Sequence, residues 1–217
     1  KIGLTHSTGL RNPTLYELYG SDNYGIGGNV NLKPEKSETN ELSVKYNILK
    51  NLSFNSTAYR AKVYDQIESN AAYSQHENEL IDINQEGLEN ELSFNGKNQR
   101  LSIFNVFSKS RKTNGQAQSR RPDLTYGANY AKKFLTSFIG PVNLNLNYKY
   151  TGKYIDWDGA KNSGQKSTDI VNVSLTKSLS GNNFSLNISN LLNERYEKPA
   201  TYSQDGRQLR FGFKRSY

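Results

Sequence analysis

Few side chains in this sequence are arranged for catalysis. General acid–base and nucleophilic mechanisms commonly need a histidine beside a serine or a carboxylate. The chain has two histidines, His6 and His76, and only His76 has an acidic neighbour, Glu77. No serine or aspartate motif accompanies either histidine, so we predict that the protein is not an enzyme. The chain contains no cysteine, which excludes disulfides and thiolate metal sites, and we expect no metal site and no cofactor.

A second group of side chains suits binding rather than catalysis. Between residues 109 and 121 the chain carries Arg111, Lys112, Arg120 and Arg121 without an acidic residue. Such a cluster attracts anionic ligands without needing a fixed geometry. Simple solvation is the plainer explanation of the same residues, and both alternatives stay open.

The composition is unusual for a compact soluble protein. Hydrophobic residues make up 34% of the 217 residues, against about 45–50% in ordinary globular domains. Yet 12% are aromatic, including 15 Tyr and 9 Phe, which is atypical of a disordered chain. The net charge of +8 is compatible with nucleic acid, anionic lipid or anionic ligands. Because the basic residues form no stripe with interleaved aromatics, we expect no nucleic-acid binding.

Apolar and polar residues alternate with period two along most of the chain, which predicts β-strands. In residues 142–150, Val142, Leu144, Leu146, Tyr148 and Tyr150 fall on one face, whereas three asparagines and a lysine fall on the other. The same pattern predicts ten strands, at residues 2–7, 42–48, 52–65, 88–94, 101–108, 124–130, 142–150, 171–175, 184–188 and 209–213.

The connections between these strands alternate strictly between short and long. Short turns are expected at residues 49–51, 95–98, 135–141 and 180–183, and long polar loops at 8–37, 68–80, 109–121, 155–166 and 191–207. An antiparallel meander with this pattern has its tight turns at one end and its long loops at the other. Outer-membrane β-barrels have this arrangement.

The placement of basic residues separates a membrane barrel from a soluble sheet. A Lys or Arg that faces lipid at the bilayer midplane costs about 2–4 kcal/mol. Four basic strand residues lie at the alternate positions that face away from the apolar side: Lys45, Lys149, Arg210 and Lys214. The exceptions are Lys132, Lys177 and Arg215, near the short turns, where long side chains can reach the membrane surface. We therefore favour a transmembrane barrel, and keep a soluble basic β-sandwich binding module as the alternative of another class.

Three stretches carry a resemblance to a known family. The first is LRNPTLYELYG at residues 10–20, followed by NVNLKPEKS at 29–37. The second is ISNLLNERY at 188–196, followed by YSQDGR at 202–207, and the third is the terminal LRFGFKRSY at 209–217. Together they resemble the paired loop boxes, the final hairpin and the terminal strand of TonB-dependent outer-membrane receptors. Leu10, Asn12, Val30 and Arg215 depart from the family pattern.

The resemblance spans essentially the whole chain and implies its architecture. Residues 1–217 would be the last ten or so strands of an all-β, antiparallel, 22-stranded plugged barrel with short periplasmic turns and long extracellular loops. The N-terminal plug and the TonB box would lie outside these residues. The implied location is the outer membrane of a Gram-negative bacterium. The implied partners are outer-membrane lipid and lipopolysaccharide, and the TonB complex through the missing N-terminal part. The barrel-assembly machinery is a further implied partner, and it would recognise Phe211, Phe213 and Tyr217.

The resemblance also implies active uptake of a scarce nutrient that is a small-molecule metal chelate. The resemblance disfavours haem, because haem receptors of this family carry a histidine between the two boxes and this chain has none between residues 13 and 29. The spacing of the boxes and the ending at 196–207 look closest to the cobalamin-receptor branch, and ferric-siderophore receptors are the alternative. Loop packing is the plainer explanation for any single residue, but we expect ligand contacts among Arg11, Tyr16, Tyr19, Tyr24, Arg120, Arg121, Trp157, Tyr196 and Tyr202.

Overall fold

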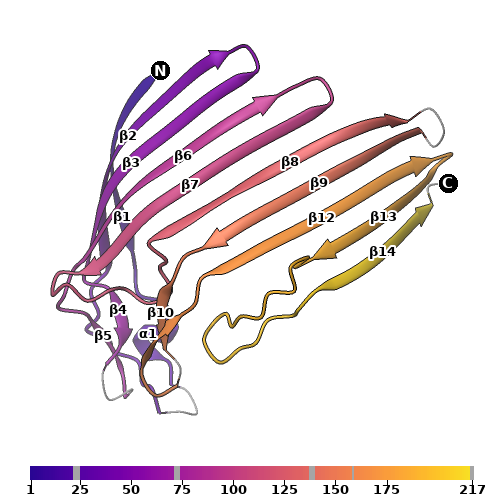
Figure 1. The fold of residues 1–217 in the computed structure, drawn as a ribbon. Helices are drawn as coiled ribbons and strands as arrows, with labels where there is room; N and C mark the ends of the chain where they lie inside the picture. The colour runs from indigo at the N-terminus through magenta and orange to yellow at the C-terminus, as the bar shows by residue number, and fades with distance from the viewer. Residues whose placement is uncertain (22–24, 71–73, 137–139, 158, 216–217) are drawn as a thin grey trace.

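Ten strands run up and down in sequence order and form one open antiparallel sheet (Figure 1). The computed structural model describes residues 1–21, 25–70, 74–136, 140–157 and 159–215. In their order across the sheet, the strands are β1 (Ile2–Arg11), β2 (Glu35–Leu49), β3 (Leu52–Tyr64), β6 (Ile83–Asn95), β7 (Gln99–Lys112), β8 (Leu124–Thr136), β9 (Gly140–Thr151), β12 (Thr168–Leu179), β13 (Asn182–Ser189) and β14 (Gln208–Arg215). The predicted ten-stranded meander is confirmed. A β-sandwich does not fit, because the described residues contain no second large sheet.

The pairing register aligns apolar side chains in rows across one face of the sheet. Residues directly opposite each other on neighbouring strands share a face. One row crosses seven strands through Phe94, Leu101, Tyr130, Leu146, Val173, Ile188 and Leu209. Many of the side chains on this face are exposed, for example Tyr46 at 62% and Phe211 at 78%. Among the described residues, the buried apolar side chains are Leu32, Ile67, Ile83 and Ala200, which lie in the long connections or at a strand end.

The opposite face is polar, and its side chains bond one another. Asn147 Nδ2 donates to Asn129 Oδ1 at 2.6 Å, and Asn172 Nδ2 donates to Asn147 Oδ1 at 3.3 Å. Lys45 and Lys149 lie in one row of this face with Glu91, as their phase predicts. The sheet thus has one apolar and one hydrogen-bonded polar surface.

The short turns lie at one end of the sheet and the long connections at the other, as expected (Figure 1). At the turn between β12 and β13, Ser180 and Gly181 have φ values of 48° and 77°. Two successive positive φ values fit a type I′ turn, whose twist matches that of the strands that it joins. Lys132 and Lys177 lie near this end on the apolar face, opposite Leu144 and Val142 respectively.

The long connections contain their own secondary structure. They include the helix α1 (Leu15–Tyr19), the pair β4 (Ile67–Ser69) and β5 (His76–Asn78), and the pair β10 (Tyr154–Trp157) and β11 (Asn162–Gln165). Three of the long strands also extend farther into the loops than predicted, because β1 continues to Arg11, β2 begins at Glu35 and β7 continues to Lys112. Within the described part of the chain, no helix has the length and apolar character needed to span a membrane.

Candidate functional site

The long connections gather at one end of the sheet, so their side chains form the candidate site (Figure 1). Two networks with a charged residue at their centre are prominent among the interactions that shape these connections. The first centres on Arg11 at the end of β1, and the second on Asp156 in β10.

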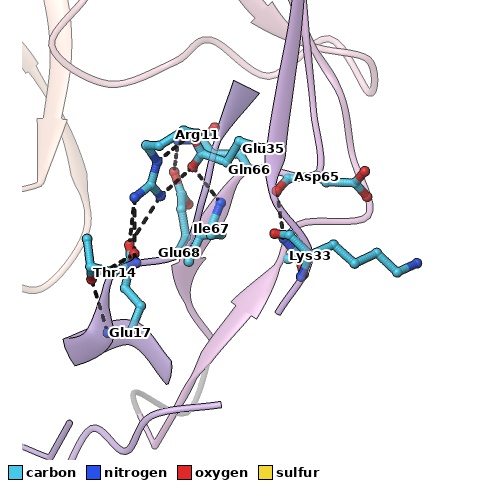
Figure 2. A network of polar contacts seen from close by, with 10 residues as sticks. Arg11, Thr14, Glu17, Lys33, Glu35, Asp65, Gln66, Ile67 and Glu68 are labelled. Atoms are coloured by element: carbon cyan, nitrogen blue, oxygen red, sulfur yellow. Dashed lines mark hydrogen bonds and ion pairs between the residues drawn. The ribbon is translucent and has the colours of Figure 1, made fainter. Parts of the chain in front are cut away.

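Arg11 joins two loop segments through a network of carboxylates (Figure 2). The register of β1 and β2 places Arg11 opposite Glu35, and the guanidinium donates to both carboxylate oxygens, at 2.8 Å from Nε and 2.7 Å from Nη2. Arg11 Nη1 also lies 3.1 Å from both oxygens of Glu17. Glu35 Oε1 accepts the backbone N–H of Ile67 at 2.8 Å. Arg11 thus links α1 and the start of β2, and through Glu35 the start of β4.

Glu17 has a second role as part of the N-terminal cap of α1. Its backbone N–H donates to Thr14 Oγ1 at 3.2 Å, and its Oε2 accepts the backbone N–H of Thr14 at 2.7 Å, which is a capping box. Burial alone would raise the pKa of Glu17, but hydrogen bonds from Thr14 and Arg11 lower the pKa below its ordinary value. Glu17 therefore stays charged and keeps Arg11 paired at neutral pH.

The segment after α1 packs against β5. Asn78 Oδ1 accepts the backbone N–H of Lys33 at 2.8 Å, and Asn78 Nδ2 donates to the carbonyls of Lys33 and Asp65 at 2.9 and 2.7 Å. The rings of Tyr16 and His76 meet edge to face, with centroids 5.9 Å apart. The two sequence boxes at 10–20 and 29–37 therefore fold as one hydrogen-bonded unit with the next connection.

Asp156 joins three connections that are far apart in sequence. Its carboxylate is 1% exposed. Asp156 Oδ1 accepts Arg120 Nε at 2.7 Å and the N–H of Trp157 at 2.9 Å, while Oδ2 accepts the N–H of Ala200 at 2.8 Å. Burial would raise the pKa of Asp156, but these three donors outweigh burial and lower it. A buried carboxylate with this many donors fixes the loops around it.

A basic groove of about 430 Å³ lies beside the Asp156 network. Arg111 in this groove is paired with Asp123 at 2.6 Å. Arg121, Lys153 and Lys166 also line the groove, and among the described residues they make no ion pair. The groove therefore presents uncompensated positive charge.

The structure places the predicted ligand-contact residues in different surroundings. Arg11 and Arg120 hold carboxylates, and Arg121 lines the basic groove. Tyr16, Tyr19, Trp157 and Tyr202 are between 44% and 71% exposed, and Tyr196 is half-buried. Tyr24 and Tyr217 lie outside the described residues. Arg120 and Trp157 meet at one carboxylate, whereas Arg11 belongs to the other network. Ligand contact by these residues stays a prediction.

Sequence reasoning missed Asp156, Lys153 and Lys166. Asp156 lies in the short stretch DWDG, which is typical of an ordinary turn. Its partners Arg120 and Ala200 are 36 and 44 residues away, so no local pattern indicates the contact. Phe211 and Phe213 are exposed on the apolar face of β14. Their role as an assembly signal stays a prediction.

Comparisons with known proteins agree on one family. Residues 4–191 match the model described as TonB dependent receptor-like, beta-barrel. The vitamin B12 transporter BtuB of Vibrio cholerae serotype O1 is 25% identical over 206 residues, which cover 93% of this chain and 32% of that protein. The chain thus spans about a third of the length of the curated relatives it matches.

Solved structures share the fold at low sequence identity. The siderophore receptor PirA from Acinetobacter baumannii superposes with a TM-score of 0.79 at 16% identity, covering 100% of this chain and 39% of that one. The ferripyoverdine receptor of Pseudomonas aeruginosa gives 0.76 at 14% identity, with coverages of 98% and 30%. The ferric-catecholate import receptor Fiu from E. coli K12 gives 0.75 at 15% identity, with coverages of 98% and 32%.

Proposed function

Because this chain belongs to the TonB-dependent receptor family, whose members lie in the outer membrane of Gram-negative bacteria, we propose that it forms part of the wall and loops of a receptor for active uptake of a scarce nutrient. Members of this family are receptors and transporters rather than enzymes. The proposal assigns the plug and the TonB box to parts of the receptor outside residues 1–217. Pulling by the TonB complex would then displace the plug after the loops have captured the ligand.

We propose cobalamin as the ligand, and the main support is the 206-residue similarity to a vitamin B12 transporter. Cobalamin is large and has extended planar surfaces that suit aromatic side chains. Tyrosine and tryptophan contribute contact area at a low cost in conformational entropy. Tyr19, Trp157 and Tyr202 are exposed among the loops and can supply such contacts.

A ferric siderophore is the second candidate, and the basic groove favours it. Arg121, Lys153 and Lys166 attract an anionic chelate from solution, and this attraction weakens as salt screens the charges. Cobalamin carries much less negative charge than a ferric catecholate. The groove therefore gives a way to distinguish the two ligands.

Calorimetry on the complete receptor that contains these residues tests the proposal. We expect cyanocobalamin to bind tightly and a ferric catecholate to bind weakly. The reverse order would replace cobalamin by the siderophore, and tight binding of neither would remove both. The triple variant Arg121→Ala, Lys153→Ala, Lys166→Ala separates the cases further, because it weakens binding of an anionic chelate while leaving cobalamin affinity within about twofold. Lys97→Ala at the opposite end of the sheet is a control for removing a single lysine outside the groove.

A further inference from the structure

The two ends of the sheet differ in charge. The chain carries 20 aspartates and glutamates, but none of them lies in the segments that border the short turns. These segments contain ten lysines and arginines. They are residues 45–56, 92–104, 129–136, 140–147, 172–188 and 208–215. The short-turn half of the sheet is therefore uniformly basic, and the acidic residues are confined to other parts of the chain.

Half of these cations lie on the polar face of the sheet. Side chains two residues apart on a strand share a face, so the pairing register assigns each residue to one face. Arg100 and Arg210 lie in one row, whose other members are asparagines, a serine and an alanine. Lys133 and Lys214 follow one and two rows nearer the short turns. These four cations therefore point away from the apolar side.

The same four side chains carry uncompensated charge. All of them are exposed, and none forms an ion pair with another residue that the structure describes. Arg210 Nη2 donates to Oε1 of Gln208 at 2.6 Å, but this partner is neutral. Like charges without counter-charges raise the electrostatic potential of the surface that carries them. The short-turn part of the polar face therefore attracts anions and repels cations.

The sign of the charge changes along the polar face. Glu91 shares a row with Lys45 and Lys149 and marks the border. Glu89 and Glu41 lie in the next two rows towards the long loops. Both are exposed, and neither pairs with a cation among the described residues. An anion on this face is therefore repelled near Glu41 and Glu89 and attracted on the short-turn side of Glu91.

We propose that the short-turn half of the polar face makes the lumen selective for small anions over cations. The polar face of an outer-membrane barrel lines its lumen. Arginine and lysine side chains around a pore favour anions, and low-dielectric walls strengthen their field. A lumen that opens while a ligand passes also admits ions, and this surface opposes the entry of cations. The proposal rests on the barrel arrangement and holds whether the transported ligand is cobalamin or a siderophore.

Single cysteines introduced into the complete receptor in detergent measure the local potential. Residues 1–217 contain no cysteine, and any cysteine elsewhere in the receptor is first replaced by serine. Asn143→Cys places a thiol opposite Lys133, and Thr57→Cys places one opposite Glu89. Each variant is labelled with the anionic sulfonatoethyl and the cationic trimethylammonioethyl methanethiosulfonate. The ratio of the two rate constants is independent of thiol reactivity, because both reagents attack the same thiolate.

We expect the ratio of anionic to cationic labelling to be at least about tenfold higher in Asn143→Cys than in Thr57→Cys. The difference should shrink in 1 M salt, because salt screens the charges. Adding the three substitutions Arg100→Gln, Lys133→Gln and Arg210→Gln to Asn143→Cys should lower the ratio at least fivefold.

A matched control removes the same charge from the long-loop end of the apolar face. The substitutions Lys36→Gln, Arg60→Gln and Lys109→Gln, added to Asn143→Cys, should leave the ratio within about twofold.

Folding of each variant is checked by heat-modifiable gel mobility, which does not depend on labelling. If the variant with three neutralised polar-face cations fails to fold, Lys133→Gln alone takes its place and should lower the ratio at least twofold. Equal ratios in Asn143→Cys and Thr57→Cys would overturn the inference, as would an unchanged ratio in the folded neutralised variant. Failure of both reagents to label Asn143→Cys would also overturn it, because this part of the wall would then be closed to solutes.

Discussion

Arg11 was expected among the ligand-contact residues, and its side chain lies between two carboxylates. Arg11 can act as a strut, that is, as a structural link between Glu17 and Glu35, or it can contact the ligand directly. The two roles predict different effects of mutations on ligand binding. If Arg11 acts only as a strut, Arg11→Ala and Glu17→Ala both release α1 from β2. We expect the two variants to weaken ligand binding by similar factors, within about threefold of each other.

Calorimetry on the complete receptor measures this comparison, with Glu41→Ala as a control for removing a carboxylate outside the network. A loss in Arg11→Ala more than tenfold larger than in Glu17→Ala would show that the guanidinium contacts the ligand directly. Lys is a poor substitute at position 11, because it cannot bridge two carboxylates bidentately.

Asp156 is the second residue on which the loop arrangement depends. Replacing a buried acceptor leaves its donors unsatisfied, at about 1–3 kcal/mol for each buried donor. We expect Asp156→Ala to release the segment around Ala200 and to increase its amide hydrogen exchange at least tenfold. Asp205→Asn in the same connection removes an exposed carboxylate that accepts a bond from Gln208, and it should leave this exchange unchanged.

The same carboxylate predicts an acid transition. The pKa of Asp156 is lowered in the folded loops. The charged carboxylate therefore stabilises the loops fully at pH values above the ordinary aspartate pKa of about 3.9. This stabilisation is lost as the pH falls through the lowered pKa. The protection of backbone amides near Ala200 against hydrogen exchange should therefore stay constant from pH 7 to about 4 and decline below pH 4. Protection that declines between pH 7 and 5 would contradict this assignment.

At the scale of elements, alternation in the sequence predicted each strand of the sheet where one face is apolar. The ends of β1, β2 and β7 were missed because they carry too few apolar residues to show an alternation, as in Thr8–Arg11 against Glu35–Glu38, where Leu10 alone is apolar. Where water contacts both faces, nothing selects alternating residues. The pairs β4–β5 and β10–β11 were missed for a different reason, since strands of three or four residues are too short to show a period.

The apolar row yields a direct test of which face meets lipid. Leu146 lies within a row that crosses seven strands, and its neighbour Asn147 points to the polar face. Leu146→Lys should destabilise the membrane-inserted receptor by about 2–4 kcal/mol, whereas Asn147→Lys should cost less than half as much. Urea titrations of folding into lipid vesicles measure both variants. Equal costs would contradict the assignment of the faces.

At the scale of the whole molecule, the family, the outer-membrane location and the antiparallel barrel fold are confirmed. These followed from long-range regularities in the sequence, namely alternating residues and alternating connection lengths. The loop networks were not predictable in the same way. The first depends on the Arg11 guanidinium meeting two carboxylates, Glu17 and Glu35. The second depends on the Asp156 carboxylate meeting donors from distant segments, and ligand binding depends in turn on both arrangements.

The open edges of the sheet predict how these residues behave in isolation. Within the described residues, β1 and β14 each pair with a strand on one side only. Unpaired backbone groups are not tolerated in hydrocarbon, so further strands must complete the wall. Vesicles that contain only residues 1–217 should import no cobalamin, while vesicles with the complete receptor and an energised TonB system should. Import by the 217-residue piece would contradict this account.

The amide ladder of Asn129, Asn147 and Asn172 has a consequence for anything that travels along the polar face. These amides already satisfy part of one another's hydrogen-bonding capacity. A ligand or protein segment that moves along the polar face therefore forms and breaks few strong hydrogen bonds with them. Such a ligand or segment meets only a small energy barrier from these amides.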